Sequence, residues 1–431
     1  MKKKISISTT VTLVLLTVAL TVSLTMLLAM RHFNSQLQLV SKRQAMYSHI
    51  NDVDKAVREH YPDLDEELLR QNIAQGYING LNDPYAEYYS HQRYEAEKLR
   101  MAGLANNIGV VLGERKDAVT GAVEIVVTRV DDGSPASHAI IKEGDVLVSV
   151  DSAPVEGKTL SELQARIDAA EKISLTVRRG EGESAYLINA AEYDVRSVQS
   201  VILDNVGYIK VAAFYENTPE QFKEAVAALS KEGVTGLVFD LRDNAGGSSA
   251  AVKDMLSQIM PLGAYGTITD TKGNVSKLST KVSKTLTLPT VTLINGGTAG
   301  EAEFFAGVLQ EADLTYVMGE TSAGKAKCQE YFVLEQDYSA LKLTVGEYGL
   351  MKGGSWEGKG IVPATAVVLP PEQAEMYPTL SPNEDAQVQA AVDKLEESVE
   401  PPTVEPDPPV DGTTPPSATG TDGTSTTTTG E

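Results

Sequence analysis

Three segments in the second half of the chain combine glycines with polar or charged residues, in patterns that could support chemistry at a carbonyl group or an anion. The first, Asp-Leu-Arg-Asp-Asn-Ala-Gly-Gly, follows an apolar run, and the N–H groups of Gly246 and Gly247 could face a developing oxyanion. The second, Asn-Gly-Gly-Thr-Ala-Gly-Glu-Ala-Glu, predicts a helix that begins near Gly300 and offers unsatisfied N–H groups to an anion. The third is a Gly-Lys turn that presents Lys325.

Composition excludes several other chemistries. The chain has 431 residues, with 37 Lys and Arg against 59 Asp and Glu, and its net charge of −22 argues against nucleic acid as a partner. Its one cysteine, Cys328, cannot form an internal disulfide or a cysteine-rich metal site. No histidine follows His138, so a histidine-dependent nucleophile there would need a histidine from the N-terminal third. We expect no metal and no cofactor.

A phosphate loop is also excluded. Gly319 to Lys325 follows the Gly-x-x-x-x-Gly-Lys pattern, but Ala326 stands where such a loop needs Ser or Thr.

The segments that would position these residues alternate between strand and helix. Strand-like runs lie at 206–211, 234–241, 290–294, 314–318 and 341–345, and helix-like runs at 219–229, 250–259 and 301–310. This alternation predicts an α/β core with a parallel or mixed sheet and helices, which we place at 190–395.

Two smaller regions precede this core. Short β-rich runs at 108–112, 123–130, 146–150 and 173–178, with one helix-like stretch at 160–169, predict a small β-rich domain at 96–185. Residues 35–95 are typical of helix, with leucines at helical spacing between Pro62 and Asn82, and we assign them packing without chemistry.

The two ends of the chain differ from the rest. Residues 1–34 contain an uncharged run, 5–30, long enough to span about 30 Å of hydrocarbon, and three lysines precede it. We interpret it as a single-pass signal-anchor that leaves the bulk of the chain extracytoplasmic, with a cleaved signal peptide as the alternative. Residues 396–431 predict a disordered tail, because 401–431 hold seven prolines, ten threonines and no Leu, Ile, Phe, Tyr or Met.

Together these motifs resemble the C-terminal processing, or tail-specific, peptidases, a serine–lysine family. Gly-Ser-Pro-Ala from Gly133, followed by Gly144-Asp145, resembles a PDZ domain, and the resemblance as a whole covers residues 60–370. It implies protein or peptide C-termini as partners, because PDZ domains bind such ends by adding a strand to a sheet edge. The implied carboxylate-binding edge is Ile108, Gly109 and Val110.

The resemblance also assigns roles within the α/β core. Lys325 falls on the family's catalytic lysine, Gln329 on the glutamine that positions it, and Glu303 on the glutamate that closes the serine turn. The family's attacking serine lies 25 residues before the lysine, where this chain has Gly300. Glycine has no side chain, so no acyl-enzyme can form at this position.

Gly246 and Gly247 match the family's glycines on the oxyanion side. Four other side chains could replace the missing serine: Thr298, Ser248, Ser249 and Cys328. In a strand, Cys328 would point away from its neighbour Gln329, and Ser322 is expected to cap the turn before Lys325.

We therefore interpret the chain as a membrane-anchored homologue of these peptidases that recognises protein tails through a PDZ domain and is proteolytically impaired. One alternative is an active serine–lysine-type endopeptidase with a displaced nucleophile, and another is a PDZ adaptor or scaffold without enzymatic activity. The resemblance suggests a homodimer or an active paralogue as further partners, and the sequence leaves the enzymatic status open.

Overall fold

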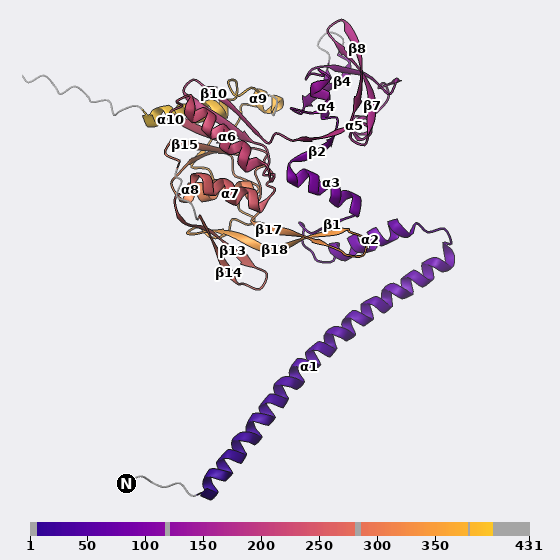
Figure 1. Cartoon of the computed structure of the whole chain (residues 1–431), viewed down its shortest axis with the longest axis vertical. Helices are drawn as coiled ribbons and strands as arrows, with labels where there is room; N and C mark the ends of the chain where they lie inside the picture. The colour runs from indigo at the N-terminus through magenta and orange to yellow at the C-terminus, as the bar shows by residue number, and fades with distance from the viewer. Residues whose placement is uncertain (1–6, 117–120, 281–285, 378–379, 400–431) are drawn as a thin grey trace, which may run out of the picture. The chain divides into compact units, whose positions relative to one another are not determined.

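The computed structural model describes residues 7–116, 121–280, 286–377 and 380–399, and the chain divides into two compact units, Met1–Tyr88 and Tyr89–Glu431 (Figure 1). The first unit contains α1 (Ile7–His60) and α2 (Glu66–Asn79), and β1 (Glu87–Tyr89) begins at its end. The start of α2 is set by Asp65, whose carboxylate accepts hydrogen bonds from the N–H groups of Glu67 and Leu68. The predicted tail lies outside the described residues from position 400 onward.

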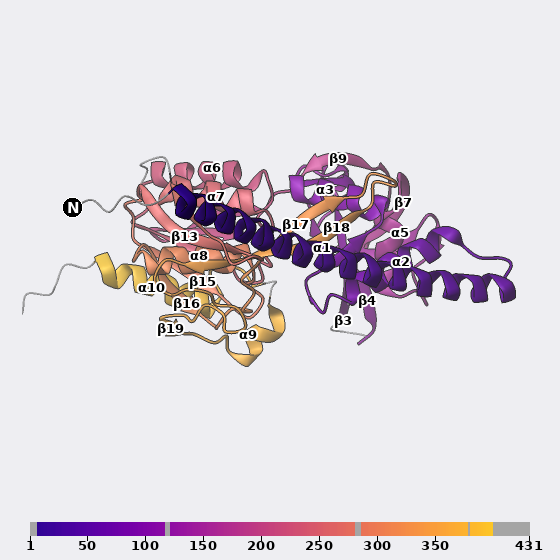
Figure 2. The ribbon, with the colours of Figure 1, turned by 90° about the horizontal axis from the view of Figure 1, so that it is seen from below.

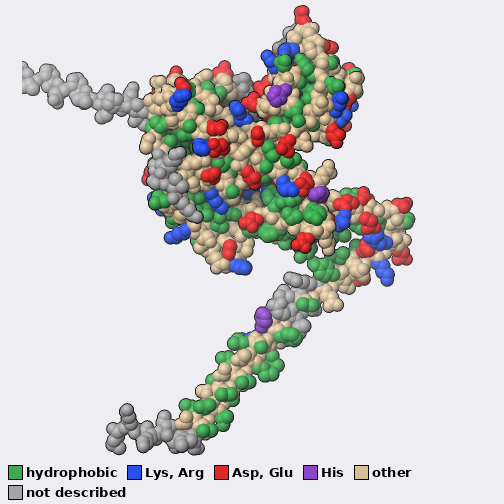
Figure 3. All heavy atoms as spheres, viewed as in Figure 1, with side chains coloured by type: hydrophobic (Ala, Val, Ile, Leu, Met, Phe, Trp, Pro, Cys, Tyr) green, Lys and Arg blue, Asp and Glu red, His purple; other side chains and the backbone are tan. Residues whose placement is uncertain are grey.

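The N-terminal part of α1, Thr10–Asn34, is the one helical segment in the described ranges that is long and apolar enough to cross a membrane. All of its side chains are exposed, and Figure 3 shows hydrophobic side chains along it. A helix that is apolar on every side suits a lipid environment, although a signal sequence has the same composition.

The β-rich region of the second unit follows α3 (His91–Ala102). Its elements are β2 (Leu104–Asn107), β3 (Val110–Lys116), β4 (Val123–Val130), α4 (Pro135–His138), β5 (Val146–Val150), β6 (Ala153–Pro154), α5 (Leu160–Asp168), β7 (Lys172–Arg179), β8 (Gly182–Asn189) and β9 (Ala191–Asp194). The main sheet runs β3-β4-β5-β7-β8, with β6 on β5, and β2 pairs with β9. Ile108, Leu147, Leu163 and Leu175 are among the buried side chains of its own core.

The predicted α/β core is present in the remainder of this unit. Its elements are β10 (Val198–Leu203), β11 (Val206–Val211), α6 (Thr218–Lys231), β12 (Gly236–Asp240), α7 (Ser249–Ile259), β13 (Gly263–Asp270), β14 (Val275–Thr280), β15 (Thr290–Ile294), α8 (Glu301–Glu311), β16 (Tyr316–Gly319), β17 (Lys327–Val333), β18 (Ala340–Leu350), β19 (Thr365–Ala366), α9 (Pro371–Met376) and α10 (Ala386–Val399).

Two sheets organise these elements. The first runs β10-β11-β12-β15-β16-β19, with β10 antiparallel and the following pairs parallel. The second is antiparallel and includes β17, β18, β13 and β14. The mixed α/β architecture expected from the alternation of strand and helix is thus confirmed.

Both faces of the parallel sheet are buried, which explains why its strands are apolar without alternation. Ile209 and Phe239 pack with α6, α7 and α8, and α6 and α7 lie side by side (Figure 2). Tyr208 and Val238, each one position earlier in its strand, point to the opposite face of the sheet, where they pack with α10.

A buried ion cluster ties β12 to the start of α10. The Arg242 side chain is 2% exposed, and its guanidinium donates to Asp240 at 2.6 Å and to Gln387 at 2.7 Å, with the Asp385 carboxylate at 2.8 Å. Burial opposes ionisation of Asp240, but the hydrogen bonds and charge of Arg242 outweigh it and hold the pKa of Asp240 below its ordinary value.

Arg242→Met should lower the free energy of unfolding by about 3–5 kcal/mol, because it leaves two buried carboxylates without their cation. Urea unfolding of the full chain in detergent measures the change. Lys223→Met is the matched control: its ion pair with Glu220 is exposed, so the free energy of unfolding should hardly change.

Wild type and Arg242→Met also test how the contribution of Asp240 to stability depends on pH. Because the pKa of Asp240 is depressed in the folded state, its contribution is present above its unfolded pKa and is lost as the pH falls through the folded value. The stability difference between wild type and Arg242→Met should therefore narrow in acid. A pH-independent difference, or equal losses for both variants, would contradict this role.

Candidate active site

The three glycine-containing segments meet at one edge of the parallel sheet. They follow β12, β15 and β16, which are neighbours, and the carboxyl ends of parallel strands share an edge. Backbone hydrogen bonds join the segments directly, from Ala299 N–H to the Asn244 carbonyl and from Ala323 N–H to the Thr298 carbonyl, both at 2.9 Å. Topology alone therefore brings together residues that are about 80 positions apart in the sequence.

The buried carboxylate of Glu303 fixes the geometry of this edge. Its Oε2 accepts from the N–H groups of Gly300 (3.0 Å) and Lys325 (2.7 Å), and its Oε1 from Ser322 Oγ (2.6 Å) and Gly324 N–H (2.7 Å). The side chain is completely buried. One carboxylate thus holds the first turn of α8 against the turn that carries Lys325.

Gly300 occupies the N-cap position of α8, with φ 61° and ψ −120°. Residues with a side chain rarely adopt this conformation, whereas glycine does so at little steric cost. A Cβ atom built here would lie 3.7 Å from the Ala245 carbonyl oxygen and 4.0 Å from Lys325 Cδ. The position expected for the nucleophile therefore faces Lys325 and has room for a small side chain, although the backbone would be strained.

Lys325 and Gln329 are brought together as the resemblance implies. Lys325 is half-buried, and its Nζ donates to Gln329 Oε1 at 2.9 Å. An irregularity in β17 between Cys328 and Gln329 interrupts the strand's pairing with β18, and Gln329 lines the cleft while Cys328 is buried. A second lysine, Lys342 on β18, lines the same cleft, and burial together with the charge of Lys325 lowers its pKa.

Gly246 and Gly247 also line the cleft, but their N–H groups have partners within the chain. Gly246 N–H donates to Asn244 Oδ1 at 2.9 Å, and Gly247 N–H donates to Glu301 Oε2 at 3.1 Å. Gly247 has φ 149°, and a Cβ there would lie 2.2 Å from the Phe214 carbonyl oxygen, so only glycine fits. The expected oxyanion donor at Gly247 is therefore already bonded to an acidic side chain.

Two of the candidate replacement nucleophiles, Thr298 and Ser248, are held in structural hydrogen bonds, and the third hydroxyl, Ser249, bonds a carboxylate of the cleft. Thr298 Oγ1 donates to the Leu241 carbonyl at 2.8 Å, and Ser248 Oγ caps α7 by accepting from Ala251 N–H. Ser249 Oγ bonds Glu301 Oε1 at 3.2 Å and makes a short contact with the Tyr348 hydroxyl.

Ser322 and Cys328, near Lys325 in the sequence, are also buried. Ser322 Oγ accepts from Ile361 N–H in addition to its bond to Glu303, so it supports the turn as expected. Burial raises the pKa of the Cys328 thiol to about 12, which makes it a poor nucleophile at neutral pH.

These groups surround a cleft of about 750 Å³. Its basic residues are Lys325, Lys342 and Arg100, its acidic residues are Asp243, Glu301 and Glu330, and Tyr215 and Tyr331 add aromatic surfaces. A cleft of this size, lined by backbone groups, aromatic rings and charges of both signs, suits a segment of polypeptide. Among the described residues no group of His, Cys, Asp or Glu side chains is arranged to hold a metal ion.

The predicted peptide-binding edge lies apart from this cleft, in the β-rich region. Gly109 and Val110 line a groove of about 670 Å³ between β3 and α5, while the side chain of Ile108 is fully buried in the core. Gly109 N–H donates to Asn107 Oδ1 at 2.7 Å.

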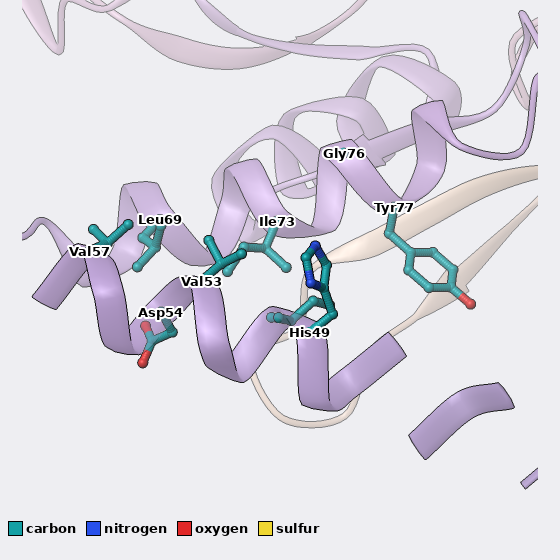
Figure 4. Close-up of a pocket in the computed structure, with 9 residues that line it drawn as sticks. His49, Val53, Asp54, Val57, Leu69, Ile73, Gly76 and Tyr77 are labelled. Atoms are coloured by element: carbon teal, nitrogen blue, oxygen red, sulfur yellow. The ribbon is translucent and has the colours of Figure 1, made fainter. Parts of the chain in front are cut away.

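A third groove lies within the first unit, between α1 and α2, with a volume of about 390 Å³. Figure 4 shows Val53 and Val57 of α1 beside Ile73 and Leu69 of α2, with Asp54 pointing away from them. Its lining is mainly apolar and brings no set of reactive groups together, so it is not a candidate active site.

Two further charged residues of the cleft, Lys342 and Glu301, bear on its chemistry without having been expected to. Lys342 interrupts the apolar run Leu341-Lys342-Leu343, and a lysine within such a strand is a signal that it faces a polar cleft. Glu301 directly follows the nucleophile position, but its bond to Gly247, 54 residues away, requires the folded arrangement of two loops.

Two segments of the chain match known protein families. Residues 205–367 match the model of peptidase family S41, and residues 126–179 match the PDZ domain. The chain is 31% identical over 321 residues to the carboxy-terminal processing protease CtpA of Bacillus subtilis, covering 72% of this chain and 66% of that protein. It is 28% identical to CtpB of the same organism, covering 72% and 65%. The chain therefore spans just under two thirds of the length of these relatives.

A solved structure shares the fold. It is a Bacteroides fragilis protein assigned to the S41 proteases, with 16% identity and a TM-score of 0.54 over 76% of this chain and 90% of that one.

Glu303→Gln should loosen the turn that carries Lys325, because an amide group replaces one of two oxygens that each accept two hydrogen bonds. We expect a loss of about 1–3 kcal/mol in the free energy of unfolding and faster hydrogen exchange over 322–325. Glu330→Gln, at an exposed site on β17, should change neither quantity. Unchanged protection of 322–325 in Glu303→Gln would show that this carboxylate does not hold the turn.

Proposed function

This chain belongs to peptidase family S41 as a PDZ-containing homologue of the C-terminal processing proteases, and we propose that it binds protein C-terminal tails with strongly impaired cleavage. The substrate class follows from the family and from the two peptide-sized grooves in the second unit. The loss of cleavage follows from two residues, Gly300 at the family's nucleophile position and Glu301 beside it.

The observation that carries this proposal is Gly300. It lies at the head of α8 and faces Lys325, where the serine–lysine mechanism requires a hydroxyl. Lys325 is retained, but the attacking oxygen is missing, and loss of a serine nucleophile removes several orders of magnitude of rate.

Glu301 is a second obstacle to catalysis. Its carboxylate accepts the Gly247 N–H hydrogen bond and brings negative charge to the site where an oxyanion would develop. Removing one oxyanion donor costs about 10²–10³ in kcat in a serine protease. The cleft and its lysine are retained, but the attacking hydroxyl is missing and the oxyanion donor is already bonded. This combination favours binding over cleavage.

We further propose that Thr10–Asn34 anchors the chain in a membrane as a single-pass segment, with the bulk of the chain extracytoplasmic. The length and apolarity of this helix support the anchor, and so do Lys2, Lys3 and Lys4 ahead of it. The partners it could then bind are protein tails outside the membrane, a second copy of the chain, or an active paralogue.

One observation favours residual peptidase activity instead. Ser249 lines the same cleft as Lys325 and is the only one of the candidate hydroxyls whose Oγ bonds a carboxylate of that cleft, Glu301. Activity through Ser249 would be abolished by both Ser249→Ala and Lys325→Ala, whereas a PDZ adaptor would show no activity to lose.

The test is cleavage of an unstructured peptide with an apolar C-terminus by the full chain in detergent, read by mass spectrometry. Wild type should show no turnover, Gly300→Ser weak turnover, and Gly300→Ser with Glu301→Ala turnover faster by on the order of a hundredfold, because the second change frees the Gly247 N–H. Adding Lys325→Ala to the double variant should abolish cleavage.

Wild-type turnover that disappears in Lys325→Ala would contradict the impaired-peptidase proposal. An inactive double variant that is folded, as judged by an unchanged urea midpoint, would show instead that the site has departed from the family's geometry at further residues.

A further inference from the structure

The outer edge of β3 is bonded to a side chain of the helix opposite. β3 is the terminal strand of its sheet, so one side of its backbone faces α5 rather than another strand. Gln164, on α5, accepts a hydrogen bond from Leu112 N–H at 2.8 Å through its Oε1 and donates one to the Val110 carbonyl at 2.9 Å through its Nε2. Its Nε2 also donates to Asp168 Oδ1 at 2.8 Å, which holds the amide in this orientation.

This pair of bonds has the pattern of an added strand. In an added antiparallel peptide, the carbonyl of one residue would accept from Leu112 N–H, and the N–H two residues further along would donate to the Val110 carbonyl. The Gln164 amide supplies the same acceptor and donor. Leu112, Val110 and Gln164 all line the groove in which a peptide would lie. The peptide and the glutamine therefore compete for the same two backbone groups.

The end of the groove near Gly109 is engaged in the same way. Asn107 Oδ1 accepts from Gly109 N–H at 2.7 Å and from the Tyr193 hydroxyl at 3.0 Å, and that hydroxyl also donates to Asp131 at 2.8 Å. Side-chain amides thus bond backbone groups at two points along the edge, Gly109 and the Val110–Leu112 pair.

We propose that Gln164 is a specificity-determining residue that closes the PDZ edge against an added strand, so that a peptide binds only by displacing its amide. This inference rests on the proposed recognition of C-terminal tails. The exchange replaces two hydrogen bonds with two of the same kind, so the peptide gains little from pairing at this point. Tails that place further apolar contacts in the groove are favoured over tails that rely on backbone pairing alone.

The experiment compares wild type with Gln164→Ala as full chains in detergent, with Gln92→Ala as the matched control. Gln92 is exposed on α3 and does not line this groove. The probe is a fluorescein-labelled ten-residue peptide ending in Val-Ala-Ala, followed by anisotropy. Gln164→Ala should bind it roughly five- to a hundredfold more tightly, which corresponds to two net hydrogen bonds released from competition, and Gln92→Ala should bind as wild type does.

Hydrogen exchange over 110–116, read by mass spectrometry without peptide, tests the bond independently. Leu112 should lose protection in Gln164→Ala while the other amides of β3 keep theirs. Unchanged exchange, or equal measurable affinities for wild type and Gln164→Ala, would overturn the role of Gln164 and leave tail recognition intact. Absence of binding by both proteins, with Leu112 deprotected, would instead contradict tail recognition and the inference with it.

Discussion

The cleft depends on the hydrogen bonds that the buried carboxylate of Glu303 accepts. A completely buried charge is costly unless it is well bonded, and here four donors from α8 and from the turn after β16 surround it. Three of these donors are backbone N–H groups, so the bonds fix the path of the chain and not only the side chains. The position of Lys325 relative to Gly300 follows from this one group, and it is maintained without any side chain at residue 300.

The architecture of the site and its reactivity are therefore separable in this chain. The parallel sheet, the Glu303 bonds and the Lys325–Gln329 pair build a peptidase cleft. In the proposed function, Gly300 supplies no attacking group, and Glu301 accepts the Gly247 N–H hydrogen bond. The turn does not require a side chain at position 300, because a glycine adopts the unusual backbone conformation at this N-cap with less strain than any other residue.

The parts of the fold that the sequence predicts are those with strong local signals. The strands expected at 206–211 and 290–294 are β11 and β15 at the same bounds, because strands buried on both faces are continuous apolar runs. Strands β13 and β14 were not predicted, since Thr, Ser and Lys give them no comparable pattern. Motif order indicated Gly300, Lys325 and Gln329. The bonds of Glu301 to Gly247 and of Gln164 to β3 were not predictable, because each joins residues more than fifty positions apart through loop and helix geometry.

The central claim, that the cleft retains its lysine but has no nucleophile, is tested most directly by looking for an acyl-enzyme. The full chain in detergent is mixed with a peptide p-nitrophenyl ester, the reaction is quenched within seconds, and the mass of the intact protein is measured by mass spectrometry. The Lys325→Ala variant is treated in the same way. The account predicts no acyl group on any hydroxyl or thiol of the cleft. Stoichiometric acylation mapped to Ser249, Ser248, Thr298 or Cys328, and absent from Lys325→Ala, would contradict it.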